Sequence, residues 1–99
     1  MLKKVYMFDE DHIALKAHAV LAAEKLHLVQ LRAIRKFADA YLHAPTELRR
    51  LGPNARGQLL RRSWMVDEES WQRFTQLRDH TGLTTGQLLH VATRLEIGD

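Results

Sequence analysis

Two stretches of this chain align without gaps: Lys3-Lys4-Val5-Tyr6-Met7-Phe8-Asp9-Glu10-Asp11 and Arg61-Arg62-Ser63-Trp64-Met65-Val66-Asp67-Glu68-Glu69. Both begin with two basic residues, carry an aromatic residue at the fourth position and share Met, Asp and Glu at matching positions. From Asp9 to Asp67 is 58 positions, which is more than half of the chain. The alignment predicts two copies of one structural unit joined by a linker.

The composition is that of one globular domain. The 99 residues are 45% hydrophobic and 27% charged, and two units of about forty residues are too short to bury separate cores, so they should share one. The chain has no cysteine, which excludes disulfides and suits a cytoplasmic protein. No apolar run is long enough to span a membrane, and the N-terminus does not read as a signal peptide.

The first unit reads as a strand followed by helical sequence. Lys3 to Phe8 favours a short strand, and Asp9 is a suitable N-cap for a helix. Helical spacing gives that helix an apolar stripe of Ile13, Ala17, Val20 and Leu21. A bend is expected at Leu26-His27-Leu28, although no Gly or Pro marks it and one long helix through Leu42 stays possible. The second helix should bury Leu31, Ile34, Phe37, Ala38, Tyr41 and Leu42.

Residues 43–58 are predicted to form a connector. Pro45, Gly52, Pro53 and Gly57 punctuate it, although residues 46–51 could form a helical turn. From Arg49 to Arg62 there are five arginines and no acidic residue. Such a run is either a solvated linker or a contact with phosphate.

The second unit has clearer boundaries. Arg61 to Val66 is the expected strand, and Asp67 is the expected N-cap of the next helix, in which Trp71, Phe74 and Leu77 share one face. Gly82 should end that helix in the left-handed conformation. Thr84 and Gln87 have the spacing of a capping box for a last helix with Leu88, Val91, Ala92 and Leu95 on its apolar face.

A strand of six residues needs a partner for its backbone groups, and the repeat supplies one. The predicted fold is therefore mainly α with a short two-stranded antiparallel β-ribbon, in the order β-α-α-linker-β-α-α. Residues 1–42 form the first unit, 43–58 the linker and 59–99 the second unit, together one compact domain.

The second unit resembles the ribbon-helix-helix DNA-binding family, the Arc/MetJ/CopG type. The resemblance covers residues 61–96 and rests on the Val66-Asp67-Glu68-Glu69 helix entry, the Gly82-Leu83-Thr84-Thr85 corner and the Leu88-Leu89-x-Val91-Ala92 helix. Residues 3–42 match more loosely, because they lack the glycine corner and have roughly three extra residues before the second helix. A single-chain tandem version is similar to accessory DNA-binding proteins of F-type conjugation.

The resemblance implies that the ribbon enters the DNA major groove. If Phe8 and Val66 point into the core, Tyr6 and Trp64 do so too, because side chains alternate along a strand. The face left for base contacts then carries Lys3, Val5, Met7, Arg61, Ser63 and Met65. The opposite orientation, which exposes Tyr6 and Trp64, remains open.

Phosphate contacts are expected from Thr84, Thr85, Arg56 and Arg62. Free N–H groups at a helix start attract phosphate, although threonine there also serves as a cap in proteins of any function. The matching stretch of the first unit, His27-Leu28-Val29-Gln30, has no hydroxyl. The two halves should therefore grip DNA unequally.

Catalysis finds little support. The six histidines show no compact metal-ligand spacing, and the chain has no phosphate-binding glycine loop. We therefore expect no catalytic residue, no metal site and no cofactor. The predicted function is sequence-specific binding of double-stranded DNA, by a transcriptional repressor or a plasmid or conjugation accessory factor, acting as a monomer or as a homo-oligomer on DNA.

Two alternatives remain. One is an antitoxin-like or other protein-interaction module that has a partner protein and dimerises through a single C-terminal ribbon-helix-helix unit. The other is a helical bundle that binds no nucleic acid.

Overall fold

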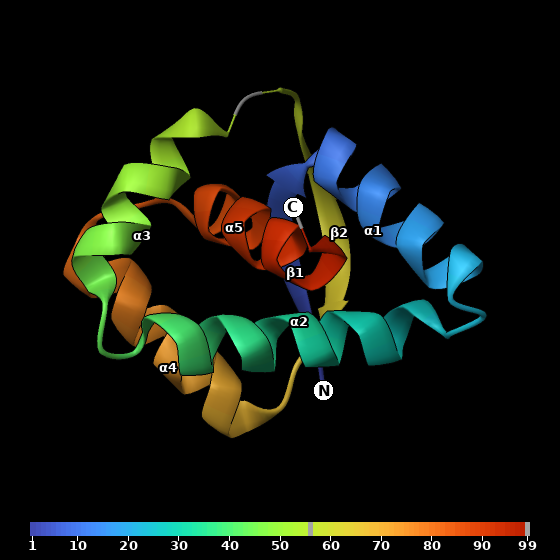
Figure 1. The fold of residues 1–99 in the computed structure, drawn as a ribbon, viewed down its shortest axis with the longest axis horizontal. Coiled ribbons are helices and arrows are strands. Elements are labelled where there is room, and N and C mark those ends of the chain that lie inside the picture. The colour runs from blue at the N-terminus through green and yellow to red at the C-terminus, as the bar shows by residue number, and fades with distance from the viewer. Residues whose placement is uncertain (56, 99) are drawn as a thin grey trace.

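An antiparallel ribbon joins the start of the chain to its middle (Figure 1). The computed structural model describes residues 1–55 and 57–98. In it, β1 (Leu2–Phe8) pairs with β2 (Leu59–Met65) in a register that places Lys4 opposite Ser63. The predicted pairing of the two strands within one molecule is confirmed.

Helices make up most of the remaining chain, in the order α1 (Asp9–Leu21), α2 (Leu26–Tyr41), α3 (Pro45–Leu51), α4 (Glu68–Thr81) and α5 (Thr85–Ile97). The predicted fold class is confirmed: the protein is mainly α, and its order of elements is consistent with a tandem ribbon-helix-helix arrangement. The chain turns at residues 22–25, so the alternative of one long helix is wrong. Within the described ranges, no helix is long and apolar enough to cross a bilayer.

The predicted connector contains helical structure of its own. α3 begins at Pro45, whose fixed φ suits the first turn of a helix, and a 3₁₀ turn (Gly52–Asn54) follows. α3 packs beside α4, so this segment closes one end of the helical layer (Figure 1).

The two units repeat with a spacing of 59 residues. α1 begins at Asp9 and α4 at Glu68, while α2 begins at Leu26 and α5 at Thr85. The buried positions follow the same spacing, in the pairs Asp11 and Ser70, Leu15 and Phe74, Val29 and Leu88, Gln30 and Leu89, Ala33 and Ala92, Ile34 and Thr93, and Phe37 and Glu96. The repeat of 58 is therefore one residue short, and the first unit has no extra residues before its second helix.

The one-residue difference changes how α1 begins and which face it buries. Its N-cap is Phe8, which makes no side-chain cap, so the predicted N-cap Asp9 is wrong. α1 buries Asp11, Leu15 and Ala19. The predicted apolar stripe instead faces solvent, with Ile13 60%, Val20 72% and Leu21 88% exposed.

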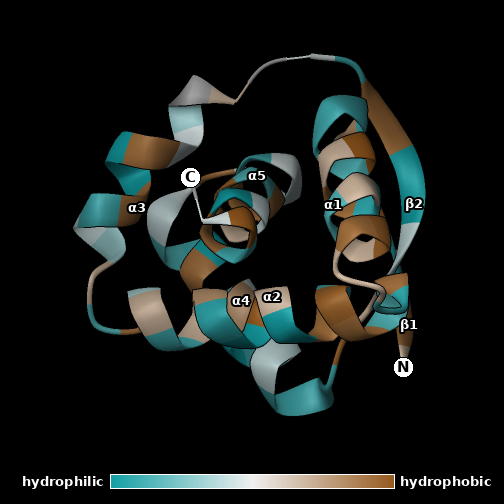
Figure 2. Cartoon of the chain, turned by 45° about the vertical axis from the view of Figure 1, so that its right-hand side comes forward, coloured by the Kyte–Doolittle hydropathy of each residue, from teal (hydrophilic) through white to brown (hydrophobic). Residues whose placement is uncertain are grey.

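The helices cover one face of the ribbon and leave its other face open (Figure 2). Beneath the ribbon lies one continuous core, to which both units contribute. Trp64 of β2 is completely buried in it, as predicted. Phe37 and Phe74 join α2 to α4, with their ring centroids 5.5 Å apart.

The corner between the helices keeps its left-handed residue in both units. Gly82 has φ 74°, as predicted, and its counterpart in the first unit is Ala23 with φ 54°. A left-handed conformation costs an L-residue on the order of 1–2 kcal/mol, whereas glycine adopts it freely. The first unit therefore lacks the glycine but keeps the geometry.

Replacing Ala23 by glycine should stabilise the protein. The expected gain in the free energy of unfolding is about 0.5–1 kcal/mol, because relief of the left-handed strain exceeds the added entropy of the unfolded chain. Gly82→Ala is the matched control, since a Cβ there meets no atom within 4 Å and the change tests the backbone alone. It should destabilise by about 1 kcal/mol. Chemical denaturation measures both, and a loss of stability in Ala23→Gly would contradict the interpretation.

Candidate nucleic-acid interface

The exposed Leu59, at the start of β2, lies at one end of the open face of the ribbon, and the rest of that face carries three residues from each strand. They are Leu2, Lys4 and Tyr6 of β1 and Arg61, Ser63 and Met65 of β2. The spacing of 59 makes these two triplets equivalent, with Lys4 and Ser63 paired at the centre. Lys4 Nζ donates to Ser63 Oγ at 2.6 Å, so the two halves of the face meet in a hydrogen bond.

The β2 half of the predicted base-contact set lies on this open face. Arg61 is exposed, and Ser63 and Met65 are half-buried. The side chain of Arg61 has no ion pair or hydrogen bond among the described residues, so its guanidinium is available to a ligand. An arginine on a ribbon can donate two hydrogen bonds to the edge of a guanine.

The predicted outward orientation of Lys3, Val5 and Met7 of β1 is wrong. Val5 is 4% exposed and Met7 is fully buried, while Tyr6, expected in the core, is 60% exposed. Lys3 is half-buried on the inner side, with Nζ 5.9 Å from the centroid of the Trp71 ring. The cause is the spacing: side chains alternate along a strand, so a shift of one residue moves every side chain to the other face.

The sequence prediction therefore missed Leu2, Lys4 and Tyr6. A signal for them was present in the helical pattern. If Leu15 is matched to Phe74 and Ala33 to Ala92, in place of matching the two aspartates, the spacing is 59. Tyr6 and Trp64 then lie on different faces of the ribbon.

Gln30 holds the outer edge of β2 in place. Its side chain donates to the Ser63 carbonyl at 3.1 Å and accepts from the Met65 N–H at 2.9 Å, as a neighbouring strand would. Its own carbonyl accepts from Trp64 Nε1 at 3.2 Å. These bonds fix the backbone behind the β2 triplet and cover an edge that could otherwise pair with another chain.

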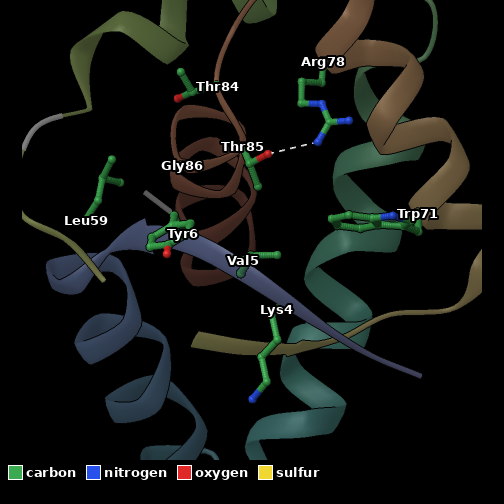
Figure 3. Close-up of a pocket in the computed structure, with 9 residues that line it drawn as sticks. All are labelled: Lys4, Val5, Tyr6, Leu59, Trp71, Arg78, Thr84, Thr85 and Gly86. Carbon is green, nitrogen blue, oxygen red and sulfur yellow. Dashed lines mark hydrogen bonds between the residues drawn. The ribbon is translucent and has the colours of Figure 1, made fainter. Parts of the chain in front are cut away.

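A shallow pocket of about 320 Å³ lies beside β1, where the N-terminus of α5 approaches the ribbon (Figure 3). Thr84 accepts from the Gln87 N–H and Gln87 bonds back, so the predicted capping box is confirmed. Arg78 Nη1 donates to Thr85 Oγ1 at 3.2 Å, which brings a cation to the helix start. The lining residues are Lys4, Val5, Tyr6, Leu59, Trp71, Arg78, Thr84, Thr85 and Gly86.

The first unit offers a different helix start. By the spacing of 59, Lys25 and Leu26 are the counterparts of Thr84 and Thr85. The predicted match of His27 to Thr84 is therefore wrong by two residues. Lys25 is the N-cap of α2 and makes no side-chain cap. The second unit therefore pairs a capped helix start with Arg78, whereas the first has an exposed lysine.

The arginines of the basic run do not form one patch. Arg62 lies on the inner side of the ribbon and is half-buried, with Nη2 3.2 Å from Asp9 Oδ1. Arg49 donates to the His80 carbonyl at 2.8 Å, and Arg50 pairs with Glu47. Arg56, the remaining predicted phosphate contact, lies outside the described residues.

Ion pairs around two buried carboxylates hold the helices together beneath the ribbon. Asp11 of α1 lies 2.9 Å from His90 Nδ1 of α5, and its burial raises the pKa of the Asp11 carboxyl despite that contact. Glu96 of α5 binds Arg32 and Lys36 of α2 at 2.6 and 3.1 Å. These groups brace α5 against α1 and α2 and lie away from the open face.

Asp67 caps α4, as predicted, by accepting from the Ser70 N–H at 2.8 Å. Partial burial opposes its charge, but hydrogen bonds from Ser70 and Arg35 lower the pKa of the Asp67 carboxyl.

Among the described residues, no three His, Asp or Glu side chains gather in a geometry that could hold a metal ion.

Searches of protein-family models, curated proteins and solved structures found no match to this chain. Any assignment of function therefore rests on the chain's own residues and geometry.

Proposed function

We propose that this protein binds double-stranded DNA in a sequence-specific manner by inserting its ribbon into the major groove. The observation that carries the proposal is the open face of the ribbon, where Lys4, Tyr6 and Arg61 are exposed while Trp64 beneath them is buried. A two-stranded ribbon fits the width of the major groove, and its outward side chains reach the base edges.

The residues of the open face suit different parts of a base pair. Arg61 and Lys4 can donate to guanine O6 and N7, Ser63 can donate or accept, and the apolar parts of Leu2 and Met65 can contact a thymine methyl group. The N-terminus of α5, with Thr84, Thr85 and Arg78, flanks the ribbon and can take a backbone phosphate.

The two halves of this interface are unequal. One triplet holds Lys4 and Tyr6, the other holds Arg61 and Ser63, and only the second unit has a hydroxyl-capped helix start. We infer a DNA site without internal symmetry. The intramolecular ribbon favours the tandem arrangement over a chain that must dimerise to complete it. A repressor or a plasmid or conjugation accessory factor acting in the cytoplasm fits these properties.

Salt dependence and the response to one arginine test the proposal. Binding to a selected duplex, followed by fluorescence anisotropy, should weaken steeply with salt because phosphate contacts release counterions. Arg61→Ala should cost about 1–3 kcal/mol on that duplex and relax the preference at one base pair. Arg50→Ala removes the same charge from α3, away from the ribbon, and should leave base preference unchanged.

Two results would count against the proposal. One is a failure to bind any duplex at low ionic strength. The other is an equal change in base preference in Arg61→Ala and Arg50→Ala. That result would show that the open face of the ribbon does not determine which bases are bound.

A further inference from the structure

The outward face of α1 is largely apolar although it is exposed to solvent. Ile13, Ala17, Val20 and Leu21 lie along it at helical spacing, and Val20 and Leu21 are 72% and 88% exposed. They line a shallow open groove together with Lys16. We call these five residues the α1 patch. A contiguous exposed apolar surface, unlike apolar residues scattered singly, is a candidate interaction site.

The second unit shows that the fold does not require an apolar surface here. At the spacing of 59, its residues on the corresponding face of α4 are Gln72, Thr75, Gln76, Asp79 and His80, and all but the half-buried Thr75 are exposed. The same helix in the same fold is thus polar in one unit and apolar in the other. An apolar face at this position is therefore specific to the first unit.

We propose that the α1 patch binds the α1 patch of a second copy of this chain, with the two helices antiparallel about a two-fold axis. The charges at the ends of the helix favour this occupant. Glu10 is exposed at the start of α1 and Lys25 is exposed just beyond its end, and neither has an ion pair within the described ranges. In an antiparallel pair centred on Ala17, Glu10 of each copy faces the turn at residues 22–25 of the other, which carries Lys25, and the small Ala17 lets the helices approach closely.

The size of the patch sets the strength of the contact. One helix face buries less than the roughly 1,200–2,000 Å² of a stable interface, so the pair should be weak in free solution. A contact between identical patches is closed by its own two-fold axis, and the polar face of α4 offers no second contact. Assembly therefore stops at two copies.

A consequence for DNA rests on the proposed function. Two copies joined through α1 are related by a two-fold axis, so the two asymmetric sites that they occupy on one duplex should be inverted and bound cooperatively. Because the bound copies share one duplex, the contact between them acts at a high effective concentration. At an effective concentration of about 1 mM, a contact with a Kd of about 0.1 mM raises the affinity for the second site about tenfold.

Sedimentation velocity of the full chain without DNA tests the contact itself. The expected result is a shift from monomer toward dimer as the protein concentration rises. In NMR spectra of the same protein, the amide signals of residues 13–21 should change position on dilution. Val20→Asp with Leu21→His copies Asp79 and His80 of the second unit, so the variant should keep its melting temperature and remain monomeric. Gln76→Ala, on the corresponding face of α4, is the matched control and should behave like the unaltered chain.

Three results would overturn the inference: a monomer at every concentration, a dimer that persists in the Val20/Leu21 variant, or shifts that map elsewhere. On DNA, the variant should lose cooperativity on inverted sites while its affinity for a single site stays unchanged. If no duplex is bound, the proposed function fails while the sedimentation result still decides whether the α1 patch is a self-contact.

Discussion

Deletion of residues 1–8 should abolish cooperative unfolding of the isolated chain. The deletion removes β1, which is the only strand paired with β2 in the described structure, together with the buried side chains of Val5, Met7 and Phe8. A single strand leaves its backbone groups without partners, and a domain of this size has only about 5–15 kcal/mol of stability. DNA binding should disappear with the fold.

Circular dichroism during denaturation and sedimentation of the truncated chain measure this outcome. A truncated protein that remains folded as a monomer would contradict the role given to β1. A folded, DNA-binding dimer formed by β2 pairing with itself would show that the second unit alone is the binding module. It would favour the alternative of a single C-terminal unit that dimerises.

Trp64→Ala should lower the free energy of unfolding by about 3–5 kcal/mol, the range observed for deletion of a large buried aromatic side chain. Trp64 is completely buried beneath the ribbon, and its Nε1 donates to the Gln30 carbonyl at 3.2 Å. The substitution leaves a cavity between both units and removes the donor to that carbonyl. Chemical denaturation of the variant and of the unaltered chain measures the difference in the free energy of unfolding.

Tyr6→Ala is the matched control for Trp64→Ala. The sequence alignment pairs the two aromatic residues, yet Tyr6 is 60% exposed on the open face. Its removal should change stability by no more than about 0.5 kcal/mol, as for most surface substitutions. Equal destabilisation by the two substitutions would contradict the assignment of faces in the ribbon.

Local chemistry made much of the second unit predictable. Asp67 as an N-cap, Gly82 in the left-handed region and the capping box of Thr84 and Gln87 each depend on a few neighbouring residues, and all three are present in the structure. The need of two short strands for a partner likewise predicted the intramolecular ribbon. The burial of Trp64 also predicted that Arg61 and Ser63 lie on the open face, because side chains alternate along a strand.

Tertiary packing decided the first unit. α1 carries apolar residues on two faces, and only its contact with α2 and α5 selects Leu15 and Ala19 for the core, leaving Val20 and Leu21 outside. Ala23 adopts the left-handed conformation at the corner of the first unit, where a glycine would have allowed the corner to be predicted from the sequence.

The phase of β1 is the clearest case. The similarity of residues in the two strands favours a repeat spacing of 58 residues. The structure has a spacing of 59, because the corresponding helices of the two units bury corresponding positions in one shared core. The sequence by itself determined that two strand-helix-helix units pair within one chain. Only the packing of α1, α2 and α5 against the ribbon decided that Lys4 and Tyr6, and not Val5 and Met7, face outward, since a shift of one residue along a strand exchanges its two faces.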